Sequence, residues 1–238
     1  MLEESSTQAE ESRIRAVYAK RKAALAGRRY SYFDPGNLFI IQERERRLLA
    51  MLERYGLCPL EKQRILEIGC GGGFWLREFI KWGALPENVV GIDLLPERIA
   101  EARYRCPQGV TLLCGNAAKL DFVDASFDLV LQSTVFSSIL DPEMKRQISQ
   151  EMLRVVKPGG ALLWYDFFRD NPRNPDVRGV RKDEIRGLFP NCEVIFKQIT
   201  LAPPLVRLLA PRSWLLCTFL TMLRILNTHY LALIRPRG

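Results

Sequence analysis

The pattern of hydrophobic and polar positions changes near residue 64. Before it, apolar residues recur at helical spacing, so residues 11–26 and 38–55 are predicted to be helices, the second ending at Gly56. Residues 1–10 are polar and are predicted to be loose. After residue 64, short and wholly apolar runs alternate with amphipathic segments. That pattern is typical of parallel strands covered by helices on both faces.

The alternation predicts an α/β fold with a doubly wound, mostly parallel sheet. Residues 1–60 are expected to form a helical lid or cover, and residues 61–238 the α/β domain. Strands are expected at residues 64–69, 88–93, 110–114, 126–132, 161–168, 192–201 and 228–236. Helices are expected between them at residues 72–83, 95–106, 141–156 and 180–189.

Four glycines lie within five positions after the first predicted strand, in the sequence GCGGG from Gly69 to Gly73. Glycine lets a ligand approach the backbone closely, and the helix that follows presents unpaired N–H groups. The dinucleotide fingerprint GxGxxG fails because Phe74 occupies its sixth position. Glu67, just before the turn, would repel a pyrophosphate and favour a cation. S-adenosylmethionine carries a sulfonium and an ammonium group and no phosphate.

The ends of the next two predicted strands add polar candidates. Asp93 follows Gly73 by twenty residues and can accept hydrogen bonds from both ribose hydroxyls, or else caps the next helix. Asn116 can bind an adenine edge or be a simple turn residue. Ala117 is small enough to let a flat ring pass.

Four successive segments resemble the motifs of class I S-adenosylmethionine-dependent methyltransferases: ILEIGCGGGFW, VVGIDLLPERI, GNAAKLDFVDASFDLVL and EMLRVVKPGGALLWYDF. The resemblance covers roughly residues 38–166. It implies a Rossmann-like sheet of seven strands, with the last strand antiparallel between the fifth and the sixth. It also implies S-adenosyl-L-methionine as the cofactor.

The resemblance implies a role for each matched residue. Glu67 would contact the methionine end, and Gln132 would face the methionine side near the transferred methyl. Leu94 would flank adenine, with Asn116 and Ala117 at its edge. Gly69, Gly71 and Gly73 would line the amino-acid and ribose portion, and Asp93 would hold the ribose. Cys70, inside the turn, is included in this site as a small packing residue rather than a nucleophile.

A hydroxyl acceptor would benefit from a general base. Asp166, at the end of the fifth strand, is the candidate; its alternative role is capping, or pairing with Arg169 or Arg173. His229, the only histidine in the chain, opens the last strand and is predicted to be structural. Tyr30, Tyr32 and Phe33 precede the second helix and either close the site as a lid or belong to the core.

Residues 202–226 are apolar and contain Arg207, Arg212 and Arg224. Eleven uncharged residues separate the last two arginines, whereas a spanning helix needs about 20. Three interpretations stay open: a C-terminal helix that packs on the sheet, the wall of a pocket for an apolar acceptor, or peripheral contact with an anionic membrane.

Charge and composition narrow the classes of partner. The net charge is +8, divided as +4 over residues 1–64, −3 over 65–166 and +7 over 167–238. The basic C-terminal part suggests an anionic substrate or surface, or a solvated face. Nucleic acid is disfavoured because QSTVFSSI replaces the Asn/Asp-Pro-Pro-aromatic motif of amino-methylating DNA enzymes. Six cysteines without a CxxC pair disfavour zinc, and an acidic start unlike a secretory signal suggests the cytoplasm.

The sequence therefore favours O-methylation of a small-molecule, sugar or lipid-linked glycan acceptor. The C-terminal segments NPRNPDVRGV, ITLAPP and THYLALIRP resemble a bacterial subgroup associated with polysaccharide and surface-glycan gene clusters. Two alternatives are a non-catalytic S-adenosylmethionine-binding regulator or partner subunit, and a nicotinamide-dependent oxidoreductase.

Overall fold

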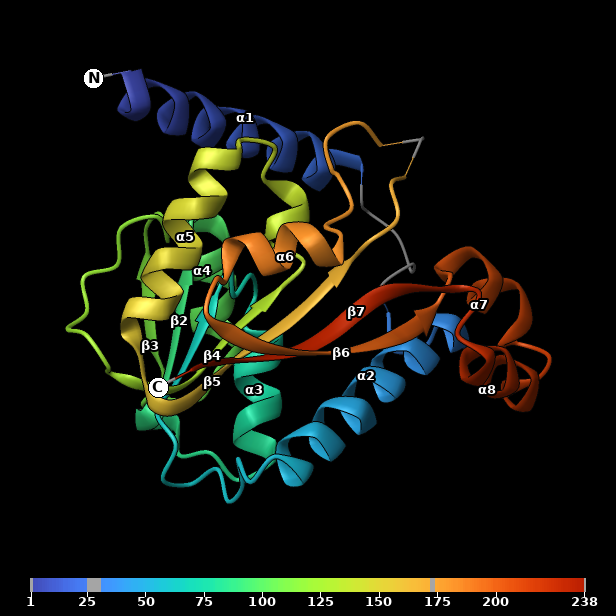
Figure 1. The fold of residues 1–238 in the computed structure, drawn as a ribbon. Helices are drawn as coiled ribbons and strands as arrows, with labels where there is room; N and C mark the ends of the chain where they lie inside the picture. Colours follow the sequence, from blue (N-terminus) through green and yellow to red (C-terminus); the bar gives the residue numbers. More distant parts are fainter. Residues whose placement is uncertain (1, 25–30, 172–173, 238) are drawn as a thin grey trace.

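Seven strands form one sheet in the computed structural model, which describes residues 2–24, 31–171 and 174–237 (Figure 1). Their spatial order is β3-β2-β1-β4-β5-β7-β6. The first five pair in parallel, and β7 pairs antiparallel with both β5 and β6. This confirms the predicted fold class. The strands are β1 (Ile65–Ile68), β2 (Val89–Asp93), β3 (Thr111–Cys114), β4 (Phe127–Ser133), β5 (Val156–Phe167), β6 (Cys192–Leu201) and β7 (Asn227–Pro236).

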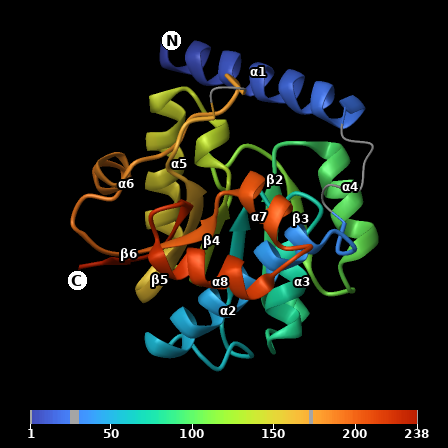
Figure 2. The same cartoon turned by 90° about the vertical axis from the view of Figure 1, so that its right-hand side faces the viewer.

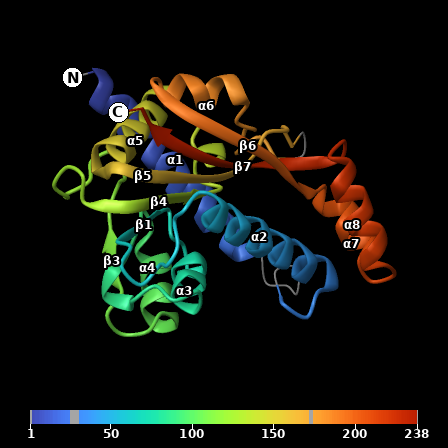
Figure 3. The same ribbon diagram turned by 60° about the horizontal axis from the view of Figure 1, so that its bottom comes forward.

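Helices cover both faces of the sheet (Figure 3). One face packs against α2, α3 and α4, and the other against α5 and α6. The helices are α1 (Leu2–Ala24), α2 (Pro35–Arg54), α3 (Phe74–Lys81), α4 (Pro96–Arg105), α5 (Pro142–Val155), α6 (Lys182–Leu188), α7 (Pro203–Leu209) and α8 (Trp214–Leu223). Two short 3-10 turns, η2 (Pro86–Asn88) and η3 (Phe136–Ser138), lie in the connections.

The sequence explains this layering locally. Successive side chains of a strand point to opposite faces, so Leu66 and Ile68 join the core beneath α5 while Ile65 joins the core beneath α2 and α3. Each is almost fully buried, and burial of such a side chain contributes about 1.5–3 kcal/mol. Asp141 caps α5 by accepting from the N–H of Glu143, and proline follows at the first helical position.

The prediction that residues 1–10 are loose is wrong, because α1 begins at Leu2 and lies against α5 (Figures 1 and 2). Ser6 Oγ donates to Asp141 Oδ2 at 3.1 Å, and Glu10 Oε1 accepts from the N–H of Leu140 at 2.6 Å. These partners lie more than a hundred residues away in sequence. Tertiary contacts order this segment. Because these contacts are with residues distant in sequence, the local polar pattern does not predict the helix.

Residues 202–226 form two helices rather than one. α7 and α8 connect β6 to β7, and Ser213 begins α8 by accepting from the N–H of Leu216. Only part of this pair is buried, through Val206, Ala210, Cys217 and Thr221.

Candidate functional site

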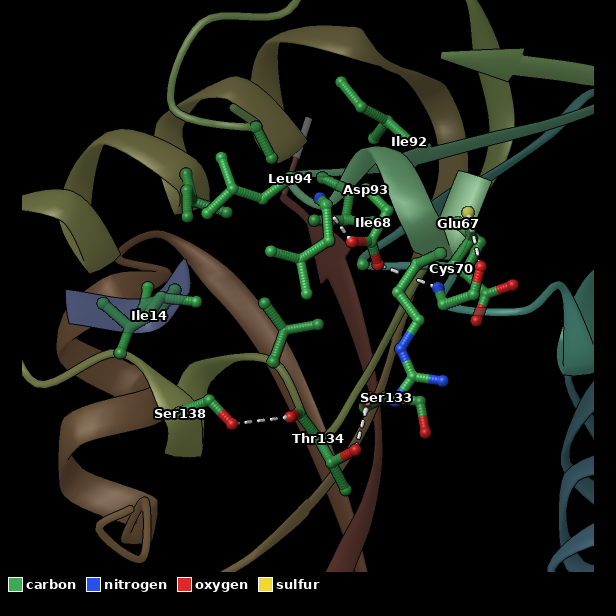
Figure 4. Close-up of a pocket in the computed structure, with 18 of the residues that line it drawn as sticks. Ile14, Glu67, Ile68, Cys70, Ile92, Asp93, Leu94, Ser133, Thr134 and Ser138 are labelled. Carbon is green, nitrogen blue, oxygen red and sulfur yellow. Dashed lines mark hydrogen bonds between the residues drawn. The ribbon is translucent and has the colours of Figure 1, made fainter. Parts of the chain in front are cut away.

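A pocket of about 470 Å³ opens at the carboxyl ends of β1, β2 and β4 (Figure 4). Its volume lies within the range of small-molecule sites. The strand order reverses between β1 and β4, and doubly wound sheets bind ligands at this point. Figure 4 shows Glu67 and Cys70 on one side of the pocket, with Ile14 on the other side and Thr134 and Ser138 between them and below.

The glycine turn forms the floor of the pocket. Gly69 and Gly71 both line it and adopt left-handed backbone angles, with φ of 66° and 53°. A Cβ on Gly69 would approach Val135 Cγ2 to 2.4 Å, whereas a Cβ on Gly71 would meet no protein atom within 4 Å. Gly73, with φ of 73°, precedes the first residue of α3 and is absent from the pocket lining. The backbone angle therefore requires glycine at Gly69, Gly71 and Gly73, and at Gly71 glycine also leaves room beside the pocket.

Asp93 ties the turn to β2. Its Oδ2 accepts from the N–H of Gly71 at 2.8 Å, and its Oδ1 accepts from the N–H of Leu95 at 2.9 Å. Leu95 is the N-cap residue of α4, so Asp93 also helps to begin this helix. Each carboxylate oxygen can accept further hydrogen bonds, so the side chain can still bind a hydroxyl of a ligand. Burial raises the pKa of Asp93.

Glu67 lies under the turn with 2% of its surface exposed. Its Oε2 is buried and accepts no hydrogen bond from the described residues. Burial, together with the nearby charge of Asp93, raises the pKa of Glu67 well above its ordinary value. A buried carboxyl oxygen without a partner is costly, and a ligand with a cationic donor would satisfy it. The pocket therefore fits a ligand with an ammonium group, which can donate to this oxygen.

Arg44 is a pocket residue that the sequence reasoning missed. It comes from α2, and its guanidinium carbon lies 5.2 Å from the ring centroid of Trp75 and 5.1 Å from that of Tyr165. Its Nε is buried and donates to no atom of the described residues. Such a guanidinium can bind an anionic group of a ligand. Nothing in the sequence marks Arg44 among the four charged residues that follow Glu43, because only tertiary packing turns it toward the sheet.

The cover of the pocket is α1, which contributes Ile14 and Tyr18. Arg13 Nη2 donates to the carbonyl of Ser138 at 2.7 Å, and this links α1 to the loop after β4. The prediction of core packing is wrong for Phe33, which is 95% exposed, and for Tyr32, which is also exposed. Their role as a lid stays a prediction. Neither residue lines the pocket. Tyr30 lies outside the described residues.

The other predicted adenine-side residues, Leu94, Asn116 and Ala117, line the pocket, as does Cys70. Asn116 also stabilises the turn in which it lies, because its Oδ1 accepts from the N–H of Ala118 at 2.9 Å. Its Nδ2 donates to Glu11 Oε2 of α1 at 3.3 Å. Gln132 is fully buried and absent from the lining; its Oε1 accepts from the N–H of Val135, and its Nε2 has no partner among the described residues.

Asp166 is fully buried and likewise absent from the lining. Its carboxylate accepts from the N–H groups of Ser137 and Phe167 at 3.0 and 2.9 Å, which fixes the η3 turn next to the pocket. Burial raises the pKa of Asp166 to about 7. Of its predicted arginine partners, Arg169 donates instead to the carbonyl of Ile225, and Arg173 lies outside the described residues. The role of general base stays a prediction.

The end of β4 and the loop after it form a hydroxyl-rich wall with Ser133, Thr134 and Ser138. Thr134 has φ of 58°, a left-handed angle that a β-branched residue rarely adopts. It is held there because its N–H donates to the carbonyl of Tyr165 and its Oγ1 to the carbonyl of Ser133. Strain of this kind is concentrated at functional sites.

His229 lies apart from the pocket lining. Its ring stacks on Tyr165 with centroids 4.9 Å apart, and burial lowers its pKa to about 3. It is therefore neutral in the physiological range. Across residues 2–24, 31–171 and 174–237, no group of three or more His, Cys, Asp or Glu side chains could hold a metal ion.

Residues 65–160 match a family model described as a methyltransferase domain. A solved structure of S-adenosylmethionine-dependent methyltransferases from Methanosarcina mazei superposes with a TM-score of 0.57 at 20% identity, over 79% of this chain and 98% of that one. The fold is that of the class I methyltransferases. The family match and this methyltransferase fold imply S-adenosyl-L-methionine as the cofactor.

Two curated relatives match over shorter stretches. The ubiquinone biosynthesis O-methyltransferase of Cereibacter sphaeroides is 35% identical over 119 residues, which cover 49% of this chain and 45% of the relative. The 2-methyl-6-phytyl-1,4-hydroquinone methyltransferase of a Synechocystis strain is 29% identical over 186 residues, which cover 73% of this chain and 55% of the relative. The chain thus spans about half the length of these two proteins.

Proposed function

We propose that this chain is an S-adenosylmethionine-dependent methyltransferase that methylates a hydroxyl oxygen of a small-molecule, sugar or lipid-linked glycan acceptor. The observation that carries the proposal is the buried Glu67 Oε2, which accepts no hydrogen bond from the part of the chain that the structure describes. It lies beneath a glycine turn whose Gly71 N–H donates to Asp93 at 2.8 Å. A carboxyl in that position suits a ligand with an ammonium group, because the positive charge stabilises the ionised carboxylate. The pyrophosphate of a dinucleotide brings no such charge, which argues against the oxidoreductase alternative.

In this proposal, each part of the cofactor is bound by different residues of the chain. Glu67 accepts from the ammonium group, and Arg44 holds the carboxylate of the methionine part. Asp93 accepts from the ribose hydroxyls, while Leu94 and Ala117 flank the adenine. The bound cofactor supplies an electrophilic methyl group on a sulfonium.

The protein's remaining work is to align the acceptor and exclude water. Ile14 and Tyr18 of α1 cover the pocket, and Ser133, Thr134 and Ser138 present hydroxyls that can hydrogen-bond an acceptor. The acceptor is proposed to be a hydroxyl because the Cereibacter sphaeroides relative is named as an O-methyltransferase. The glycan class rests on the C-terminal resemblance and the basic tail alone.

A non-catalytic binding protein is the second candidate. The observation in its favour is that Asp166, the predicted base, is absent from the pocket lining. The two candidates differ in turnover, since both bind the cofactor.

Calorimetric titration with S-adenosylmethionine and with S-adenosylhomocysteine tests the proposal. Wild type is expected to bind both at micromolar concentration, and Asp93→Ala to lose this binding. Asp183→Ala removes a carboxylate that is 98% exposed on α6 and is expected to bind like wild type. Release of S-adenosylhomocysteine in a screen of hydroxyl acceptors then separates the enzyme from the non-catalytic binder. If the protein binds a nicotinamide cofactor and neither of these two ligands, the proposal is wrong.

A further inference from the structure

α8 turns a row of large apolar side chains toward solvent. Leu215, Phe219 and Met222 recur at helical spacing and are 81%, 56% and 67% exposed. The chain stays apolar and exposed beyond the helix, with Ile225 at 71%. A surface helix normally places polar residues on that side. We name these four residues, together with Leu208 of α7 and Leu223, the apolar face.

The helices that carry the apolar face pack against the rest of the domain. The opposite side of α8 buries Cys217 and Thr221, and Trp214 packs edge-on against Phe39 of α2 with ring centroids 5.6 Å apart. α7 packs against the start of α2, where a Cβ on Gly36 would lie 2.9 Å from Arg207 Cα. In Figures 1 and 3 the two helices project beyond one end of the sheet. The exposure is therefore a property of folded structure rather than of a loose loop.

Three exposed arginines lie beside this face. Residues 202–226, which form α7, α8 and their connections, contain three arginines and no Asp or Glu. Arg212 and Arg224 are exposed at the two ends of α8. Arg169 is also exposed and donates to the carbonyl of Ile225 at 2.9 Å, which adds a third cation beside the apolar face.

We propose that α7 and α8 dock this protein on an anionic phospholipid surface, with α8 lying in the plane of the headgroups. The apolar side chains enter the acyl boundary, and the arginines pair with lipid phosphates. At ten residues α8 is about 15 Å long, half the thickness of a hydrocarbon core. Among the described residues, no helix is long and apolar enough to span a membrane.

Charge argues for lipid over a second copy of the chain. A two-fold interface would set the apolar face against itself, and Arg212, Arg224 and Arg169 would then meet their own like charges. Residues 194–238 offer no carboxylate to neutralise them. An anionic lipid surface supplies counter-charge to all three arginines.

Flotation of the full chain with vesicles tests the proposal, and its readout does not depend on methyl transfer. Vesicles of phosphatidylcholine with phosphatidylglycerol are expected to carry the protein upward, and vesicles of phosphatidylcholine alone to carry much less. The triple variant Leu215→Ser, Phe219→Ser, Met222→Ser is expected to lower partitioning by on the order of tenfold or more, because its buried apolar area is lost. The matched control, Tyr104→Ser with Val123→Ser, alters side chains that are 91% and 77% exposed elsewhere and is expected to float like wild type.

A charge variant keeps the apolar face intact. Arg212→Gln with Arg224→Asn is expected to lower partitioning by about fivefold for each arginine, and added salt to lower that of wild type. Asn suits position 224 because the backbone there has φ of 62°. Thermal melting checks that each variant is folded.

Failure of wild type to float with phosphatidylglycerol vesicles would overturn the proposal, as would equal flotation with neutral vesicles. A loss of flotation as large in the control as in the triple variant would overturn it too. Light scattering tests the alternative of self-association. If wild type is a dimer that does not float, and the triple variant is a monomer, the apolar face is a surface for self-association instead.

Discussion

The carboxylate of Asp93 accepts a hydrogen bond from the backbone N–H of Gly71 at 2.8 Å. The residue expected to hold a ribose therefore also shapes the turn expected to receive the rest of the ligand. Because the bond joins the ends of β1 and β2, the turn is held in place before any ligand arrives. Preorganisation of this kind lowers the cost of binding.

Gly71→Ala is expected to weaken S-adenosylmethionine binding at least tenfold, because its Cβ would intrude beside the pocket. It should also lose about 1 kcal/mol of stability from its positive φ. Gly56→Ala is the matched control, since Gly56 has φ of 67° and open space around its Cβ, and it lies at the end of α2. Calorimetry and thermal melting should show a similar loss of stability in both variants and a loss of affinity in Gly71→Ala alone. Equal affinities would contradict the assignment of the turn.

Arg44 is expected to bind the carboxylate of the cofactor. Arg44→Ala should weaken S-adenosylmethionine binding by on the order of tenfold or more, as expected for a charge-assisted hydrogen bond in a partly buried site. Titration with decarboxylated S-adenosylmethionine isolates the pair: removal of the ligand carboxylate should weaken binding to wild type and hardly affect Arg44→Ala. Arg46→Ala, on the exposed side of the same helix, should behave as wild type. If both proteins lose the same affinity with the decarboxylated ligand, Arg44 has another role.

The contact between α1 and Ser138 is expected to support cofactor binding. Arg13→Ala removes a 2.7 Å hydrogen bond to the Ser138 carbonyl and should raise the dissociation constant by about five- to tenfold. Hydrogen exchange should show faster exchange along α1 in this variant. Arg15→Ala, which loses only a pair with Glu11 within the same helix, serves as the control. An unchanged dissociation constant in Arg13→Ala would mean that α1 does not secure the pocket.

Asp166 makes stability depend on pH. Its pKa is about 7 in the folded chain against an ordinary value of 3.8, so between about pH 4 and 7 the unfolded chain has released a proton that the folded chain retains. Stability therefore falls as pH rises through this window, and the decrease is complete above pH 7. Asp166→Asn lacks this proton, so its melting temperature should fall less than that of wild type between pH 5 and pH 8.

The exposed carboxyl of Asp183 provides the comparison for that measurement. Asp183→Asn should follow the wild-type pH profile. A profile for Asp166→Asn as steep as that of wild type would show that other buried carboxyls dominate the dependence.

Strands and helices with a clear pattern of apolar residues could be predicted from the sequence. The strand at residues 192–201 was predicted with its observed bounds, and the antiparallel place of the last strand was also correct. Gly69, Gly71 and Asp93 could be placed at the pocket because their position at strand ends fixes where they lie.

What could not be predicted depends on contacts between distant segments. The cover formed by Ile14 and Tyr18 needs α1 to dock on the loop after β4, and no local pattern encodes that docking. Arg44 faces the pocket only because its helix packs against β6 and α7. The burial of Asp166 beside Ser137 likewise depends on how the η3 turn packs against the end of β5.

The connection between β6 and β7 has a consequence for how this chain can vary. Leu201 and Asn227 are partners in the sheet, so α7 and α8 are the tip of an antiparallel hairpin whose stem is complete without them. The tip can be exchanged for a short turn or for another hairpin while the strand register beneath it is kept. An exchanged tip would still have to cover Phe39 at the start of α2, because α7 and α8 pack there and the same helix carries Arg44 to the pocket.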